Sequence, residues 1–390
     1  MRTNHIQKLF GAKFGAPAET PAEPLEWTFP EQPLEYVDAA TNVNADTRHA
    51  RIVDLYRYLR EHDNINWYKD QALRQFLTET VYENPYIPSA VREREFLSRS
   101  QPTLPRKFID VWDTEGLPRE LFIINPNDLE AAFRNVPDII EAFKKSNVHD
   151  TSYYFTKLSE WLITLGAIET QQARTVLDVG AAYHGFAQVA VENNPNVHIT
   201  MLDLVFAPGR SKFRDRIDQI GSDAGDMQMV EDNSIDLVCA HNALEHFCGD
   251  ADTHCIREVV RVLKPGGRML ITPIFFDERT SLSINPFSCF GLAQSNFLEN
   301  AILEEIEDPN VRIDFRPNII SPYSRRYDYD TLMRRLVEAA PELEVKLVTP
   351  VFKPDGFNDG VFEREIFGLE LQQNIYDRRI FHCLELELKE

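Results

Sequence analysis

One stretch of the sequence, TVLDVGAAYHGFAQVAVENNPNVHITMLDLV at residues 175–205, constrains the fold more than any other. It predicts a buried strand, a tight loop, a helix and a second strand, which is the repeating unit of a parallel sheet. Loops of this kind usually hold a nucleotide and are rich in glycine. This loop keeps only Gly180 and Gly185, so the loop alone leaves its ligand open.

The same alternation of strands and helices continues downstream. Periodicity predicts a late helix in YDYDTLMRRLVEAA and two late strands in LEVKLVTPVF and FHCLELELKE. The expected fold is therefore an α/β domain around a parallel sheet. Its strands are predicted at 175–179, 198–203, 217–222, 235–240 and 268–274, and its helices near 185–194, 243–247 and 252–263.

Three further segments differ in composition from this domain. Residues 1–47 are rich in proline and predict an extended arm, whereas residues 48–150 predict mainly helices, broken by prolines over 84–125. The domain proper is expected over residues 151–390. Within it, residues 275–326 lack clear periodicity and are far longer than the usual connection of about 4–6 residues, which predicts a lid. We expect this lid and the helical segment to roof an acceptor site; the alternative is that the helical segment only stabilises the domain or mediates dimerisation.

Composition excludes several classes of protein. The net charge of -21, from 41 basic and 62 acidic residues, argues against a nucleic acid as the main partner. No apolar run approaches the roughly 20 residues needed to span a bilayer, and no signal peptide is evident. Five cysteines, an odd number, indicate reduced thiols and a cytoplasmic location. The cluster HFCGDADTHC lacks a Cys-x-x-Cys pair, so we expect no metal site.

Two ligands compete for the loop after the first strand. Gly180, Ala182 and Gly185 fit a variant of the dinucleotide fingerprint, in which Asp203 would hold a ribose. Asp178, however, stands two residues before Gly180, and a carboxylate gains nothing from a position so near two phosphates. It is better suited to an ammonium and a sulfonium, which it attracts by charge and hydrogen bonding.

Four further pieces follow in order: ITMLDLV, SDAGDM, EDNSIDLVCAHNALEHF and VVRVLKPGGRMLITPI. Together with the loop, they resemble the class I S-adenosylmethionine-dependent methyltransferase superfamily, in the group with a DxGxGxG loop and an LEH element. The resemblance covers about residues 170–276. It implies a Rossmann-like, doubly wound, mostly parallel seven-stranded sheet with an antiparallel last strand, and S-adenosyl-L-methionine as cofactor.

The resemblance also implies which residues contact that cofactor. Asp203 would take both ribose hydroxyls, and Asp223 with the N–H of Ala224 would bind adenine. Ala182 and His184 depart from the family pattern, which has glycines there. The full implied set is Asp178, Gly180, Ala181, Ala182, Tyr183, His184, Asp203, Leu204, Asp223, Ala224 and His241.

Methyl transfer from a sulfonium is an in-line displacement, so the protein mainly aligns nucleophile, methyl carbon and sulfur. An alcohol must also lose a proton, whereas an amine or carboxylate needs little help. His241 follows the fourth strand and is expected to serve as general base or cofactor contact, unless it is only a polar helix-start residue. His246 and Asp277 are further catalytic candidates, and both have structural alternatives as packing and solvated residues.

The sequence therefore predicts a methyltransferase for a small-molecule or glycan-like acceptor. O-methylation is favoured because His241 offers a base, while N- and carboxyl-methylation stay open. A non-catalytic cofactor-binding subunit is the alternative from another class. An NAD-dependent oxidoreductase is disfavoured by Asp178 and the downstream pieces. The expected partners are the acceptor and, through the N-terminal segment, a second copy of the chain.

Overall fold

The computed structural model describes two compact units, of which the larger comprises residues 96–280 and 326–390. The predicted arm at 1–47 lies outside the described residues, as do most of the helical segment 48–150 and three residues of the loop, Ala182, Tyr183 and His184. The described residues are 106–124, 126–134, 136, 151–181, 185–284, 305, 308, 310–315, 323–352 and 382–389.

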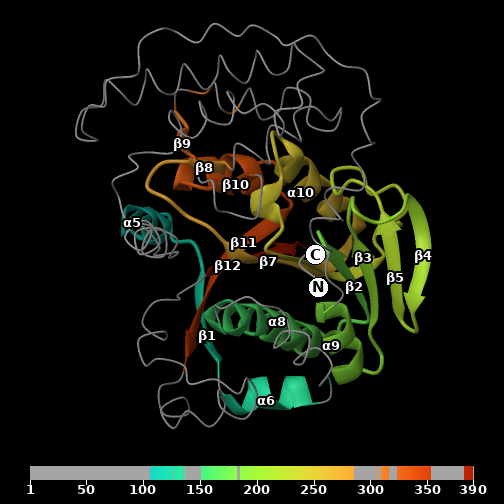
Figure 1. The fold of residues 1–390 in the computed structure, drawn as a ribbon. Helices are drawn as coiled ribbons and strands as arrows, with labels where there is room; N and C mark the ends of the chain where they lie inside the picture. The colour runs from blue at the N-terminus through green and yellow to red at the C-terminus, as the bar shows by residue number, and fades with distance from the viewer. Residues whose placement is uncertain are drawn as a thin grey trace, which may run out of the picture. The chain divides into compact units, whose positions relative to one another are not determined.

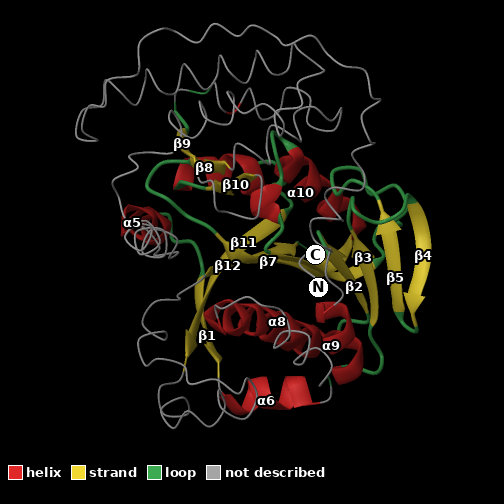
Figure 2. Cartoon of the chain, viewed as in Figure 1, coloured by secondary structure: helices red, strands yellow, loops and turns green. Residues whose placement is uncertain are grey.

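A nine-stranded sheet forms the centre of the larger unit (Figures 1 and 2). Its order is β1-β11-β12-β7-β6-β2-β3-β5-β4. All neighbouring strands are parallel except β12, which is antiparallel to both β11 and β7, and β4, which is antiparallel to β5. The strands are β1 (Arg119–Ile124), β2 (Thr175–Val179), β3 (His198–Leu202), β4 (Gly209–Arg214), β5 (Ile217–Gly221), β6 (Ile235–His241), β7 (Leu263–Ile274), β11 (Leu343–Phe352) and β12 (His382–Leu388).

The predicted α/β architecture with an antiparallel last strand is confirmed, and two edge strands extend it. The central strands are continuous buried runs such as VLDV in β2, which is typical of parallel strands covered on both faces. The edge strand β4 reads GRSKFR and is largely exposed. Its charges suit an unprotected edge, and they also hide it from a periodicity search.

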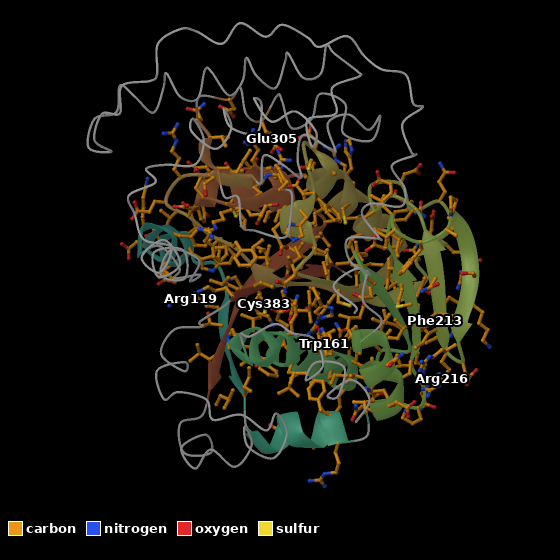
Figure 3. All side chains as sticks on the ribbon, viewed as in Figure 1. Arg119, Trp161, Phe213, Arg216, Glu305 and Cys383 are labelled. Atoms are coloured by element: carbon orange, nitrogen blue, oxygen red, sulfur yellow. The ribbon has the colours of Figure 1, made fainter. Side chains whose placement is uncertain are left out.

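Helices cover both faces of this sheet (Figure 1). On one face lie α6 (Pro126–Arg134), α8 (Thr151–Gln171) and α9 (Gly185–Asn193), which pack with the strands into one hydrophobic cluster. Trp161 of α8, labelled in Figure 3, lies between Phe133 and Phe186, with ring centroids 6.1 and 6.4 Å away. The other face carries α5 (Arg106–Thr114), α10 (Ala251–Val262) and α13 (Tyr329–Leu332) in a second cluster.

Several elements differ from the sequence prediction. The segment predicted as proline-broken contains α5 and β1, and β1 pairs with β11 in parallel. Its neighbouring prolines bound the strand rather than abolish it, because they stand at its ends. The helix predicted over 243–247 is a single 3-10 turn, Leu244–His246. The late helix is the four-residue α13 followed by a π-helical turn, Met333–Val337.

The smaller unit contains a three-stranded sheet in the order β10-β8-β9. Its strands are β8 (Ser281–Ile284), β9 (Arg312–Phe315) and β10 (Tyr323–Arg326), and β8 is parallel to β9. Arg325 is buried there and pairs with Glu305, which also accepts a hydrogen bond from the Tyr323 hydroxyl at 2.7 Å. Part of the predicted lid therefore has regular structure, while much of it lies outside the described residues.

Within the described part of the chain, every helix is too short or too polar to cross a lipid bilayer.

Candidate functional site

The candidate site is built at the edge where the parallel strands end. Asp178 is the penultimate residue of β2, and its register partners are Met201 in β3 and Cys239 in β6. Asp203 directly follows β3, and His241 is the last residue of β6. In an open α/β sheet this edge is where ligands bind. The structure therefore brings together residues that the sequence spreads over more than sixty positions.

The turn after β2 depends on Gly180. Its φ is +73°, a left-handed conformation that side chains rarely adopt. A Cβ on Gly180 would also lie only 2.4 Å from the Cβ of Ala243. The Gly180 N–H donates to Leu202 O at 2.8 Å, and that of Ala181 donates to the same oxygen at 3.3 Å. The turn is thus fixed against both neighbouring strands.

Asp203 and Asp223 stand at the ends of the neighbouring strands β3 and β5. Asp203 Oδ1 accepts a hydrogen bond from the Val205 N–H at 2.9 Å. Asp223 Oδ1 does the same for the Gly225 N–H at 2.7 Å. Each carboxylate therefore holds its own turn with one oxygen while remaining at least partly exposed to solvent. Leu204, beside Asp203, is 41% exposed.

The segment after Asp223 is anchored to α10. Glu258 Oε2 accepts from the Met227 N–H at 2.7 Å, and Arg261 donates to Met227 O and Val230 O, both at 2.9 Å. Arg261 also bonds Glu258, which lowers the pKa of that carboxyl despite its partial burial. The ion pair therefore stays charged and fixes the position of the segment at neutral pH.

His241 occupies a buried position between α8, α9 and β2. Its side chain is 7% exposed, and its Nδ1 lies 3.4 Å from Asp178 Oδ1 without forming a hydrogen bond within the described residues. Its Nε2 lies 2.9 Å from Thr164 Oγ1 on α8. The ring is 4.4 Å from that of Phe186, centroid to centroid. Both ring nitrogens therefore face protein atoms.

The other two catalytic candidates lie on neighbouring turns. His246 ends the 3-10 turn after β6, is 38% exposed, and has its Nε2 3.6 Å from Glu245 Oε1. Glu245 itself is buried. Asp277 follows β7; its N–H donates to Tyr327 O, and its Oδ1 accepts from the Glu278 N–H at 2.8 Å. Contacts with neighbouring residues therefore fix part of the position of both His246 and Asp277.

Asp178, Cys239 and His241 also form a group whose potential metal-ligating atoms lie within 4.8 Å of one another. The Cys239 thiol, however, donates to Asp178 Oδ1 at 3.6 Å. Burial, and then the Asp178 carboxylate, raise the pKa of this thiol well above its usual range. Asp178 and Cys239 are register partners in β2 and β6, and His241 ends β6, so the three side chains form part of the candidate site.

Comparison with protein families identifies the kind of domain that contains this edge of the sheet. Residues 177–271 match a family model described as a methyltransferase domain. This part of the chain is a methyltransferase domain, in agreement with its resemblance to the class I S-adenosylmethionine-dependent superfamily. The match runs from β2 to β7 and so includes every described cofactor candidate from Asp178 to His241. S-adenosylmethionine is therefore the cofactor of the domain.

Solved structures of several methyltransferases are similar to the chain. One is a 1,6-didemethyltoxoflavin N1-methyltransferase from Burkholderia thailandensis, 14% identical, with 68% of this chain and 91% of that one covered and a TM-score of 0.37. A mitomycin 7-O-methyltransferase is 14% identical, with 67% and 60% covered and a TM-score of 0.34. These similarities carry no information about the acceptor. Comparison with curated protein sequences gives no match.

The described residues of the methyltransferase domain fit the cofactor. The turn at Gly180 packs directly against Ala243, because a Cβ at position 180 would lie only 2.4 Å from the Cβ of Ala243. Carboxylates stand at or near the ends of β2, β3 and β5, and they are acceptors of the kind that an ammonium, a ribose and an adenine amine require.

Sequence reasoning missed a buried polar group on α8 of the methyltransferase domain. Glu160 is fully buried, and its Oε2 accepts from Asn242 Nδ2 at 2.6 Å and lies 3.4 Å from Lys157 Nζ. Burial raises the pKa of Glu160, although Lys157 and Asn242 oppose that rise. The one signal in the sequence is the charge of Glu160, which stands in the largely apolar run LSEWLITLGAI of α8.

Proposed function

We propose that this chain transfers a methyl group from S-adenosylmethionine to a small-molecule acceptor. The observation that carries the proposal is the set of carboxylates Asp178, Asp203 and Asp223 at the ends of adjacent strands, around a turn that only glycine permits at position 180. Such a set suits a ligand with one ammonium, one ribose and one adenine. A dinucleotide would instead bring two phosphates towards Asp178.

Each cofactor residue has a proposed role. Asp203 accepts from the ribose hydroxyls with the oxygen that does not hold Val205, and exposed Leu204 supplies an apolar surface for the base. Asp223 and the N–H of Ala224 bind the adenine. Asp178 acts electrostatically from beneath the turn that Gly180 and Ala181 form. The roles expected for Ala182, Tyr183 and His184 concern positions outside the described residues.

The bound cofactor supplies an electrophilic methyl carbon. Asp178, Asp203 and Asp223 would hold the cofactor, the acceptor lone pair would receive the methyl group, and the carbon–sulfur bonding electrons would remain with sulfur in S-adenosylhomocysteine. An acceptor that carried a proton on its nucleophilic atom releases it to water or to a base. The protein contributes by holding the reactants in line and by excluding water.

We favour an amine or carboxylate acceptor over an alcohol, because His241 is already engaged. Its Nε2 contacts Thr164 and its Nδ1 faces Asp178, so it takes an acceptor proton only if the Thr164 contact is exchanged. O-methylation with His241 as base is the second candidate. It is supported by the Asp178 carboxylate, which stands where it would stabilise an imidazolium.

Calorimetry with S-adenosylhomocysteine and NAD, followed by a screen of amines, carboxylic acids, alcohols and sugars for S-adenosylhomocysteine release, tests the proposal. We expect binding of S-adenosylhomocysteine, negligible binding of NAD, and turnover with an amine or acid. Binding without turnover for any acceptor would favour a non-catalytic subunit. NAD binding without S-adenosylhomocysteine binding would refute the proposal.

The variant His241→Asn separates the two chemistries once an acceptor is known. If His241 is a base, the variant loses turnover, and the pH–rate profile loses one ionisation. If it only positions, turnover falls while the shape of the profile stays that of the wild type.

A further inference from the structure

One turn of α8 holds two consecutive residues at the end of β6. Thr164 Oγ1 contacts His241 Nε2 at 2.9 Å, and Glu160 Oε2 accepts from Asn242 Nδ2 at 2.6 Å. Glu160 and Thr164 are four residues apart on a helix, so their side chains lie on the same face. The end of β6 is therefore tied to α8 through residues far from it in sequence.

Asn242 connects α8 to the turn after β2 that contains Gly180. It has a φ of +48°, and its N–H donates to Thr272 O at 2.9 Å. The next residue, Ala243, approaches Gly180 so closely that a Cβ on Gly180 would lie 2.4 Å from that of Ala243. A shift of Asn242 would thus move the wall against which the Gly180 turn packs.

The buried carboxyl of Glu160 differs from the other residues of this region in the cost of its burial. It is 0% exposed, and its Oε1 has no hydrogen-bond partner within the described part of the chain. Burying a charged or half-satisfied carboxyl opposes folding, and an apolar side chain would avoid that cost. The carboxyl is therefore a poor stabilising group, but it fixes the geometry of Asn242.

We infer that Glu160 is a positioning residue of the cofactor site, acting through Asn242 and Ala243 on the Gly180 turn. This inference rests on the proposed function, because the turn matters only if it holds S-adenosylmethionine. Glu160 does not touch the cofactor. It sets the conformation of the segment that does, and Thr164 does the same for His241.

The test is calorimetric binding of S-adenosylhomocysteine to four proteins: wild type, Glu160→Gln, Glu160→Ala and the control Glu169→Ala. Glu169 is an exposed glutamate on the same helix, so its variant reports any general effect of the substitution on α8. We expect Glu160→Ala to weaken binding about tenfold, the loss that one strong hydrogen bond implies. Glu160→Gln should stay within about threefold, because its amide oxygen still accepts from Asn242.

A second variant removes the same hydrogen bond by changing its donor, Asn242, instead of its acceptor, Glu160. Asn242→Gly keeps the left-handed backbone and removes the amide that bonds Glu160. We expect it to match Glu160→Ala, and the double variant to be no weaker than either, since both remove one interaction. Asn242→Gly also keeps the test decisive if Glu160→Ala does not fold.

The outcomes separate the two proposals. Failure of the wild type to bind S-adenosylhomocysteine refutes the proposed function. Wild-type binding with unchanged affinity in Glu160→Ala or Asn242→Gly overturns the positioning role alone. Equal losses in Glu160→Gln and Glu160→Ala would overturn it too, because they would show that the charge acts rather than the bond to Asn242.

Discussion

The two halves of the cofactor edge are held in different ways. At the ends of β3 and β5, Asp203 and Asp223 are at least partly exposed, and each accepts from a backbone N–H two residues further on. At the end of β6, His241 and Asn242 are held by side chains 77 and 82 residues away on α8. The first half is local and partly exposed, the second distant and largely buried.

This difference predicts what a substitution does in each half. A partly exposed carboxylate that accepts from a backbone N–H of its own turn lies outside the hydrophobic core, so its removal should affect ligand binding more than folding. A buried side chain that connects a helix to a strand contributes to both, so its removal changes binding through the fold. The comparison is tested by measuring ligand affinity and unfolding free energy for variants in each half. Substitutions in the exposed half should change affinity alone, whereas those in the buried half should change both.

The largest effect is expected from Asp203→Ala in the exposed half. Two charge-assisted bonds to ribose hydroxyls are worth roughly 1.5–3 kcal/mol each, so S-adenosylhomocysteine binding should weaken about a hundredfold or more. The Val205 N–H also loses its acceptor, but it is near solvent and water can replace it. Calorimetry measures the affinity, and the control Asp203→Asn retains an acceptor for Val205 while losing the charge.

A melting temperature of Asp203→Ala close to that of the wild type is part of the same prediction. Unchanged affinity in the folded variant would show that the ribose is bound elsewhere. A large loss of stability would show instead that the exposed half is as coupled to the fold as the buried half.

The division between local and distant contacts also explains what the sequence could predict. The strands β2, β3 and β6 are largely apolar runs, and the carboxylates Asp178 and Asp203 stand within β2 and directly after β3. Their identification needed only neighbouring residues. The dependence of Gly180 on Ala243 needed the structure, because it arises from two strands meeting side by side.

Two of the missed features, β1 and the role of Glu160, depend on partners far along the chain, whereas β4 pairs with its neighbour β5. Strand β1 is stable because β11 pairs with it, although many elements of the chain separate their first register partners, Arg119 and Leu347. The charged edge strand β4 lacks an alternation of apolar residues that would mark it. Glu160 is one of two acids in α8, and nothing in its sequence neighbourhood indicates that its carboxyl accepts from Asn242.

A buried histidine elsewhere in the sheet, outside both halves of the cofactor edge, should give the domain a pH-dependent stability. His382, at the start of β12 opposite Ile274, is buried, and Thr349 Oγ1 lies 3.1 Å from its Nδ1. Burial, and then the nearby charge of Arg119, labelled in Figure 3, lower the pKa of His382 to about 4. The unfolded chain takes up this proton near pH 6.5, whereas the folded chain resists it to about pH 4.

The stability contributed by neutral His382 is therefore complete above about pH 6.5 and is lost as the pH falls towards 4. Its size is at most about 3 kcal/mol, because each tenfold difference in proton affinity between the folded and unfolded chain corresponds to about 1.4 kcal/mol. Urea unfolding of wild type and His382→Gln at several pH values checks this. We expect the wild type to lose more unfolding free energy than the variant between pH 6.5 and 4, and parallel curves would contradict the assigned role.

The smallest effect concerns the turn that joins the two halves. Gly180→Ala imposes a left-handed conformation on alanine and drives its Cβ to 2.4 Å from that of Ala243. Gly116 has a φ of +70° with nothing within 4 Å of its Cβ position, so Gly116→Ala carries the conformational cost alone. We expect Gly116→Ala to lower the unfolding free energy by about 1 kcal/mol, and Gly180→Ala by about 2 kcal/mol.

A double variant, Gly180→Ala with Ala243→Gly, removes the collision but keeps the backbone strain at position 180. Its unfolding free energy in urea is corrected for the cost of Ala243→Gly alone. We then expect it to regain most of the difference between the losses in Gly180→Ala and Gly116→Ala. If it does not, the close approach of Ala243 is not what fixes the turn, and the link between the buried and exposed halves would have to run through the bonds to Leu202 instead.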